Sequence, residues 1–210
     1  MVGVRPEAPN QLEFYLGSRI TPAGYAWVFP KSERHANVGL GVLASRAKRR
    51  PIEYLQEFIE QMPHLKCGKV VEINAGGVPV CGPLEKTVAD GLLVVGDAAR
   101  QVNPLTGGGI DCAMRAGTIA GEVAARAVAE GDTSEKTLQE YEKRWRQEMG
   151  QRLKRYLKAK EVLLNLSDKE MDRLAEALSR VKFERISLTD MLRVLIRSSP
   201  KLLWKLKGLL

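Results

Sequence analysis

The chain has 210 residues, of which 44% are hydrophobic and 28% charged, and a formal net charge of +8. This composition is typical of a globular domain and excludes a disordered chain, collagen and a disulfide scaffold. No apolar run approaches the ~18–20 residues of a membrane-spanning helix, and residues 1–10, with Arg5 and two prolines, are not expected to be a signal peptide. Three cysteines without CxxC spacing indicate a reducing, cytoplasmic compartment.

The first region, residues 1–75, is predicted to be a mostly antiparallel sheet with one helix. Short runs of aromatic and aliphatic residues predict strands here and just beyond, at residues 11–16, 24–29, 38–43, 69–74 and 77–80. Tyr25, Trp27 and Phe29 alternate, which places all three on one face of their strand. A helical stripe between Pro51 and Pro63 predicts the helix.

The second region, residues 76–132, has a different pattern. Residues 92–95 are a short apolar run without alternation, which predicts a strand buried on both faces. Gly96 and Asp97 end this strand, and a loop with three consecutive glycines, residues 107–109, follows. A helix is predicted from about residue 110 to residue 129.

The order of strand, acidic turn, glycine-rich loop and helix predicts a ligand site. Glycines before a helix leave backbone N–H groups uncovered at the positive end of the helix dipole, which suits a phosphate or another electron-rich group. The carboxylate of Asp97 can accept hydrogen bonds from ligand hydroxyls. The alternative is a glycine-rich connector before a helix that lies close against a sheet through its small residues, which are Ala113, Ala116, Gly117, Ala120, Gly121 and Ala124.

The third region, residues 133–210, is predicted to be helical. Helix-start patterns occur at Asp132 with Glu135, Ser167 with Glu170, Ser187 with Asp190, and Ser199 with Pro200. This region also carries the whole excess of positive charge. Residues 1–133 hold 14 Lys plus Arg and 14 Asp plus Glu, whereas residues 134–210 hold 19 and 11.

A basic segment can contact anionic lipid or nucleic acid, or can be a solvated surface. The aromatic residues of this segment fall at helical spacing and show no stacking platform, so no nucleic-acid partner is predicted. Residues 202–210 mix Trp and Leu with Lys, as helices at a membrane interface do. A terminal helix that docks its Leu face on the protein body would have the same pattern, so both interpretations stay open.

The remaining candidates predict no metal site and no hydrolytic site. His35 and His64 have no ligand partners at metal-binding spacing and are interpreted as surface or loop residues. Cys67, Cys81 and Cys112 are expected to be buried small hydrophobic residues.

The motifs of the second region resemble a known family. Residues 93–99 (LVVGDAA) and 103–110 (NPLTGGGI) resemble the second flavin motif of the para-hydroxybenzoate-hydroxylase superfamily of FAD proteins. Within that superfamily, residues 24–31 (GYAWVFPK) resemble the aromatic strand motif of the geranylgeranyl reductase family, and residues 77–83 resemble its return into the flavin domain. The implied fold is α+β, with part of an α/β FAD-binding domain, an antiparallel substrate sheet and a helical C-terminal region.

The resemblance also implies roles for individual residues. Asp97 would accept a hydrogen bond from a ribityl hydroxyl of FAD, and Pro104 would shape the loop beside the isoalloxazine. The helix start would lie against the flavin and its pyrophosphate through Gly107, Gly108, Gly109 and Ile110. Tyr25, Trp27 and Phe29 would line a cavity for an isoprenoid chain, although such aromatic residues are also common as plain core. No proton donor is identified.

The implied activity is FAD-dependent saturation of the double bonds of geranylgeranyl chains, on archaeal-type glycerophospholipids or a prenyl diphosphate. The electron donor, NAD(P)H or a ferredoxin-like protein, is left open. Complete members begin with a strand–GxGxxG–helix unit, which is not found here, so the chain is expected to correspond to their C-terminal half. The alternatives are an aromatic hydroxylase, a quinone-linked dehydrogenase, and a non-catalytic fragment that binds lipid or a partner chain.

Overall fold

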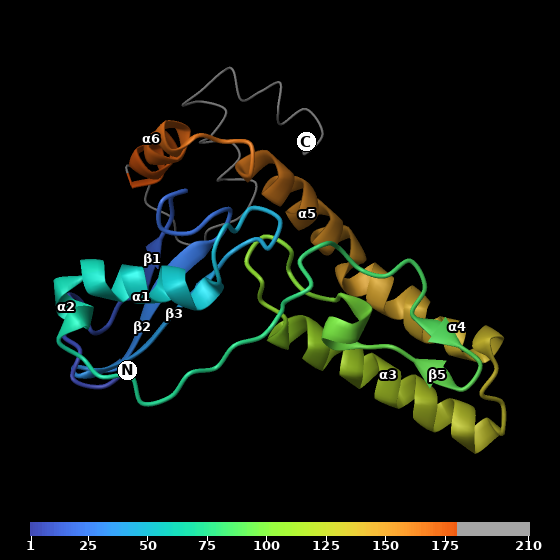
Figure 1. Cartoon of the computed structure of the whole chain (residues 1–210). Coiled ribbons are helices and arrows are strands. Elements are labelled where there is room, and N and C mark those ends of the chain that lie inside the picture. The colour runs from blue at the N-terminus through green and yellow to red at the C-terminus, as the bar shows by residue number, and fades with distance from the viewer. Residues whose placement is uncertain (180–210) are drawn as a thin grey trace. The chain divides into compact units, whose positions relative to one another are not determined.

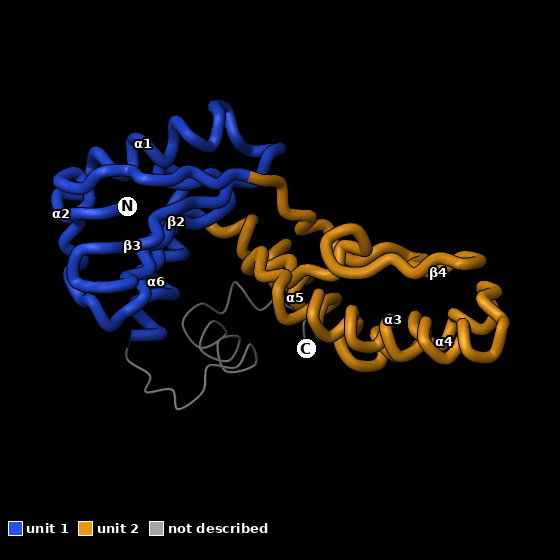
Figure 2. The backbone as a smooth tube through the Cα atoms, turned by 90° about the horizontal axis from the view of Figure 1, so that it is seen from below, with its two compact units in different colours: residues 1–75, 167–180 blue, residues 76–166, 181–210 orange. Residues whose placement is uncertain are grey.

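The computed structural model describes residues 1–179, which combine helices with antiparallel strands and confirm the predicted α+β class. The described residues divide into two compact units (Figure 2). Unit 1 comprises residues 1–75 and 167–179, and unit 2 comprises residues 76–166. The helix starts predicted at Ser187 and Ser199 lie outside the described residues, and the division into three functional domains stays a prediction.

Unit 1 is a three-stranded antiparallel sheet with a helix packed on it (Figure 1). Its elements are β1 (Glu13–Tyr15), β2 (Tyr25–Ser32), β3 (His35–Gly41), α1 (Pro51–Gln61), α2 (Pro63–Lys66) and α6 (Asp168–Ser179). The strands lie in the order β1-β2-β3, and Trp27 of the central strand pairs with Phe14 and Gly39. Pro63 ends α1 as predicted and also opens α2, because proline is well tolerated in the first turn of a helix.

The two faces of this sheet differ in what they bury. Ala26 and Val28 are fully buried and pack in one core with Phe58 of α1 and Leu65 of α2. Tyr25, Trp27 and Phe29 alternate with them and are only half-buried, as the period of two in a strand requires. The aromatic residues therefore lie on the face opposite the core.

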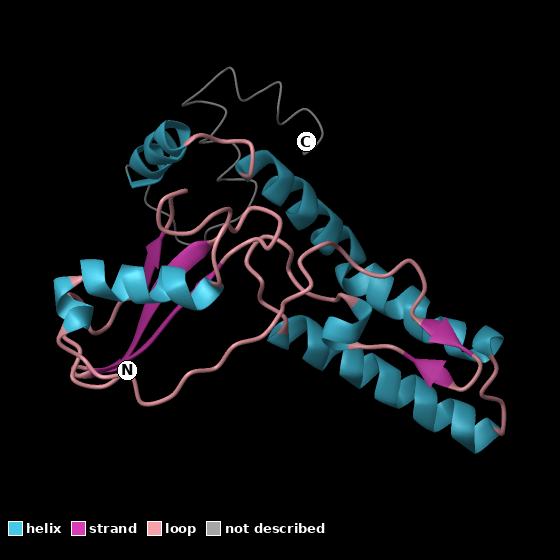
Figure 3. Cartoon of the chain, in the orientation of Figure 1, coloured by secondary structure: helices cyan, strands magenta, loops and turns pink. Residues whose placement is uncertain are grey.

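Two predicted strands are absent from the described residues. Residues 69–74 and 77–80 are irregular and belong to the long loops in Figure 3. Only Lys69 pairs with another segment, through a single bridge to Val2. Val71 and Ile73 are about two-thirds exposed. Apolar β-forming residues predict a strand only where a neighbouring strand can pair with them, and here none does.

Unit 2 combines a small hairpin with helices that lie side by side (Figure 1). Its elements are β4 (Val88–Ala89), β5 (Leu92–Leu93), η1 (Gly96–Ala99, a 3₁₀ turn), α3 (Ile110–Glu130), α4 (Glu135–Trp145), η2 (Arg146–Gly150, a π turn) and α5 (Gln151–Leu163). The strand predicted at residues 92–95 is present but shorter, as Leu92–Leu93, and its predicted burial on both faces is wrong, because Leu92 is half exposed. Asp90 and Gly91 form the two-residue hairpin turn before it.

Helix α3 packs chiefly against α4. Ala116 and Ala120 lie in a core with Tyr141 and Trp145 of α4. The small residues were expected to bring this helix against a sheet. Within the described residues, α4 rather than a sheet packs against the buried Ala residues of α3. A side chain added at Gly121 would meet open space.

The helix starts differ in one position from the prediction. Glu170 and Ser167 form the expected capping box of α6, with the Glu170 carboxylate accepting from the Ser167 N–H at 2.8 Å. Helix α4, however, is capped by Ser134 rather than Asp132. The Asp132 carboxylate accepts from the Ser134 N–H at 2.9 Å, so it orders the turn before the helix.

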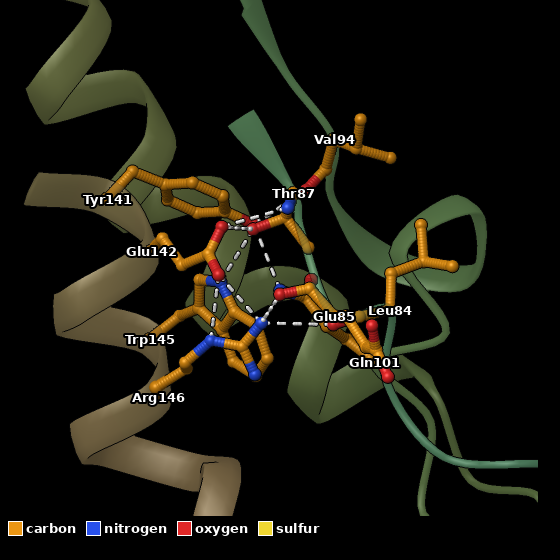
Figure 4. A network of polar contacts seen from close by, with 9 residues as sticks. All are labelled: Leu84, Glu85, Thr87, Val94, Gln101, Tyr141, Glu142, Trp145 and Arg146. Carbon is orange, nitrogen blue, oxygen red and sulfur yellow. Dashed lines mark hydrogen bonds and ion pairs between the residues drawn. The ribbon is translucent and has the colours of Figure 1, made fainter. Parts of the chain in front are cut away.

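A buried carboxylate joins α4 to the segment before β4 (Figure 4). Glu142 Oε2 accepts from the Thr87 N–H at 2.8 Å and from the Thr87 hydroxyl at 3.1 Å. Its other oxygen accepts from Arg146 Nη2 at 2.7 Å, and Arg146 also donates to the Leu84 carbonyl at 3.0 Å. Trp145 Nε1 donates to the Thr87 hydroxyl at 3.0 Å. Every polar atom of this cluster that is named here has a partner, as burial demands.

We expect Glu142→Gln to lower the free energy of unfolding by about 1–3 kcal/mol at neutral pH, because the substitution replaces one acceptor oxygen with a donor. Burial raises the pKa of Glu142, but the Thr87 N–H and the Arg146 guanidinium outweigh burial and hold it below its usual value. The stabilisation is therefore present above the unfolded pKa of about 4.3 and is lost as the pH falls through the folded pKa.

Denaturant unfolding from pH 7 to pH 3 measures both effects. Glu140→Gln is the matched control, because Glu140 lies two residues earlier in α4 and pairs with Arg126 on the surface; it should change stability by less than about 1 kcal/mol. A difference between wild type and Glu142→Gln that does not shrink at acid pH would contradict this account.

Candidate functional site

The turn that carries Asp97 is closed on itself. Gly96 has a φ of +61° and Arg100 a φ of +54°, so left-handed residues stand at both ends of η1. Gln101 then binds Gly96 twice: its N–H donates to the Gly96 carbonyl at 2.9 Å, and its side-chain oxygen accepts from the Gly96 N–H at 2.8 Å. The closed turn leaves Asp97 exposed.

The Asp97 carboxylate lies against the start of α3. A Cβ atom added to Gly109 would come within 2.9 Å of Asp97 Oδ1. Gly109 is the N-cap residue of α3 and offers no side-chain cap, so the first N–H groups of this helix are open to a ligand. A carboxylate acceptor and a helix N-terminus therefore lie within one small area.

Asn103 closes the glycine-rich loop. Its side-chain oxygen accepts from the Leu105 N–H at 3.0 Å, its N–H donates to the Gly108 carbonyl at 2.9 Å, and its own carbonyl accepts from the Gly107 N–H at 2.8 Å. Pro104 is buried beneath the loop, whereas Gly108 and Ile110 are exposed. The position of Pro104 is compatible with a role in loop shape but not with an exposed ligand contact.

Apart from the buried Pro104, the predicted cofactor residues of unit 2 thus form one surface. Asp97 can accept from hydroxyl groups, and the α3 start can donate to an anionic or carbonyl oxygen. The space that a side chain at Gly109 would fill is left free for the carboxylate. These groups fit the ribityl and neighbouring parts of a flavin. Among residues 1–179, no cluster of three or more His, Cys, Asp or Glu could hold a metal ion.

The aromatic residues of unit 1 form a second candidate site. Phe14 of β1 lies 5.8 Å from Tyr25 and 5.4 Å from Phe29, and Trp27 lies 5.6 Å and 6.0 Å from the same two rings. We call these four residues the aromatic face. Phe14 is 53% exposed, and burial raises the pKa of the Tyr25 hydroxyl. An open group of rings suits an extended apolar ligand.

A glycine sets the position of the central ring. Gly39 pairs with Trp27 across the strands, and a Cβ atom added at Gly39 would come within 2.4 Å of the indole. Trp27 Nε1 donates to the Asn37 side chain at 3.3 Å. The indole therefore lies over the backbone of β3.

Known proteins match this chain over nearly its whole length. A family model described as geranylgeranyl reductase catalytic domain matches residues 1–78. A digeranylgeranylglycerophospholipid reductase of Methanothermobacter thermautotrophicus is 52% identical over 98% of this chain and 52% of its own length. One from Methanococcoides burtonii is 50% identical over 93% of this chain and 48% of its own length. The chain is therefore similar to the geranylgeranyl reductase family, as its motifs indicate.

A solved structure supports the family at the level of the fold. A geranylgeranyl bacteriochlorophyll reductase-like protein from Thermoplasma acidophilum matches with a TM-score of 0.91 and 37% identity, over 100% of this chain and 53% of that one. The chain thus spans about half the length of the family members that it matches.

Some residues were wrongly placed by the sequence alone. Cys67 and Cys81 are exposed, and only Cys112 is buried. His64 is no plain surface residue: its side chain is 11% exposed, with Nε2 lying 3.7 Å from a Glu13 carboxylate oxygen. Two positions that support the site of unit 2, Asn103 and Gln101, were not singled out. Asn before Pro in a glycine-rich loop is a signal for a turn that could have identified the first.

Proposed function

We propose that this chain forms part of a flavin-dependent reductase that saturates the double bonds of geranylgeranyl chains on glycerophospholipids. The observation that carries the proposal is the identity of about 50%, over 93–98% of the chain, to proteins named digeranylgeranylglycerophospholipid reductases. The names of these relatives do not favour an aromatic hydroxylase or a quinone-linked dehydrogenase.

FAD is the proposed cofactor, and the surface of unit 2 would hold it. Asp97 would accept from a ribityl hydroxyl, and the N–H groups at Gly109 and Ile110 would donate to the flavin or its pyrophosphate. Gly107 and Gly108 would lie against the flavin, with the Gly108 N–H donating to the Thr106 hydroxyl at 3.2 Å. Bound there, the reduced cofactor would supply the hydride for one alkene carbon, and a proton would add to the other carbon. The task of these residues is to hold and orient the ring system.

The aromatic face of unit 1 would bind the isoprenoid chain. Tyr25, Trp27 and Phe29 present apolar surface with few polar groups, which suits a hydrocarbon better than a phenol. Covering the alkene with these rings would exclude water from the reacting carbon atoms. The electron donor, NAD(P)H or a ferredoxin-like protein, is not distinguished by these residues.

Flavin binding tests the first part of the proposal. The purified chain should bind FAD or FMN, and Asp97→Ala should weaken binding by about 1–3 kcal/mol, because ligand hydroxyls lose their acceptor. Gly109→Ala should weaken it as well, because the added methyl displaces the Asp97 carboxylate. Flavin absorbance and fluorescence titration measure both effects.

Gly121→Ala is the matched control. Gly121 lies in the same helix, its added methyl meets open space, and alanine favours a helix over glycine, so flavin affinity should not change. If wild type binds neither FAD nor FMN, the chain does not hold the cofactor by itself, and the non-catalytic alternative is favoured.

Lipid binding tests the second part. Gly39→Ala should weaken binding of a geranylgeranyl lipid, because the methyl pushes the Trp27 indole out of its place. Gly41→Ala in the same strand meets open space and should bind as wild type does. Quenching of intrinsic fluorescence by a geranylgeranyl lipid in detergent measures the affinity, with Trp27→Phe identifying the part of the signal due to this ring. Equal affinities of the two glycine variants would remove the aromatic face from the site.

We further propose that the chain meets its lipid substrate at the cytoplasmic surface of a membrane through the basic residues 134–210. No helix within residues 1–179 is long and apolar enough to cross a bilayer. Helix α5 presents exposed Lys154 and Arg155, and exposed basic groups favour anionic lipid. The free exposed thiols of Cys67 and Cys81 are consistent with a reducing compartment.

Sedimentation with vesicles tests this contact. The chain should pellet with anionic vesicles at low salt and be released as salt screens the charges. Reversing Lys154 and Arg155 to Glu should weaken the association, whereas reversing the exposed Lys31 of unit 1 should not. A chain that stays in the supernatant at low salt contradicts the proposal.

A further inference from the structure

Two residues outside the predicted cofactor site hold the turn that carries Asp97. Gln101 and Tyr141 are both fully buried, and they lie 40 positions apart in the sequence. Gln101 Nε2 donates to the Tyr141 hydroxyl at 3.0 Å, and that hydroxyl donates to the Val94 carbonyl at 2.8 Å. Figure 4 shows Tyr141 reaching from α4 toward this strand end.

The Tyr141 hydroxyl therefore bridges the two ends of the turn. Val94 lies two residues before Gly96, and Gln101 closes the turn through both bonds to Gly96. The series of hydrogen bonds runs from the Val94 carbonyl through Tyr141 and Gln101 to the Gly96 N–H. Asp97 lies between Val94 and Gln101, the two residues that the Tyr141 hydroxyl joins, and its carboxylate lies against Gly109.

Burial makes this series cooperative. A buried polar atom that loses its partner costs far more than the net contribution of one hydrogen bond. Removing the Tyr141 hydroxyl leaves the Val94 carbonyl and Gln101 Nε2 without a partner at the same time. For Nε2 to reach another acceptor, the Gln101 side-chain amide would have to rotate. Rotation would move its oxygen away from the Gly96 N–H.

We propose that Gln101 and Tyr141 are positioning residues for the flavin site, which hold the Gly96–Asp97 turn so that the carboxylate faces the start of α3. This inference rests on the proposed function, since it assigns Asp97 to the cofactor. Neither residue touches the ligand in this account. They act through the backbone conformation of the turn, and their effect on flavin affinity is separate from their effect on stability.

A residue that bonds to the same helix, just before β4, supplies a matched control. Thr87 is also fully buried, and its hydroxyl donates to Glu142 and accepts from Trp145 Nε1. The Thr87 hydroxyl has no hydrogen bond to the turn of residues 96–101 among the bonds of the described residues. Tyr141→Phe and Thr87→Val each remove one buried hydroxyl with little change of shape, but only the first removes a contact with the ends of the turn.

The experiment compares these two variants in the full 210-residue chain. Both should lower the melting temperature. Only Tyr141→Phe should raise the hydrogen-exchange rate of the Gly96 amide, by about tenfold or more, and weaken FMN or FAD binding by about tenfold, as expected for the loss of a buried hydrogen bond. Gln101→Met should have the same two effects from the other end of the series.

Two results would overturn the proposal. One is an unchanged exchange rate of the Gly96 amide in both Tyr141→Phe and Gln101→Met. The other is a loss of flavin affinity in Thr87→Val equal to that in Tyr141→Phe, which would make the effect a general loss of stability. If wild type binds no flavin, the proposed cofactor role of Asp97 fails, and the proposal fails with it even where the exchange data show that the turn is held.

Discussion

The requirement that buried polar atoms be paired governs unit 2. Helix α4 turns a polar side toward the hairpin segment, and its residues Tyr141, Glu142 and Trp145 each place a polar atom in a buried region. Each of these atoms finds its partner on the backbone or side chains of residues 84–101. A two-stranded hairpin with two residues in each strand has little stability by itself. Helix α4 adds hydrogen bonds to the segment before the hairpin. Tyr141 of the same helix also bonds to Val94 and Gln101, on either side of the acidic turn.

Unit 1 follows a different principle. Its sheet buries small residues, Ala26 and Val28, against α1 and α2, and leaves its large rings half-buried on the opposite face. Placing the largest apolar residues away from the core is costly for a protein whose only need is stability. The arrangement is consistent with a face that an apolar ligand covers. The two candidate sites therefore have different origins: paired polar atoms hold the site of unit 2, and partly exposed aromatic rings form the site of unit 1.

Much of the fold could be predicted because its signals are local. Proline at both ends marked α1, glycine after Glu130 marked the end of α3, and alternation placed the three rings of β2 on one face. Signals that depend on distant partners failed. The apolar run at residues 69–74 has the composition of a strand, but within residues 1–179 only Lys69 pairs, through one bridge to Val2. The alternation in β2 also does not show which of its two faces packs on α1. The bond between Gln101 and Tyr141 spans 40 residues, and no local sequence pattern in either segment predicts it.

The indole of Trp27 lies over a glycine of the adjacent strand, and this has a consequence for how the aromatic face can change. The contour of the face depends on an atom that is missing from β3, not only on the rings themselves. A methyl group added at residue 39 would overlap the indole, so the ring could not stay in its present position. A change of one residue on β3 can therefore reshape a surface whose rings all stand on β1 and β2.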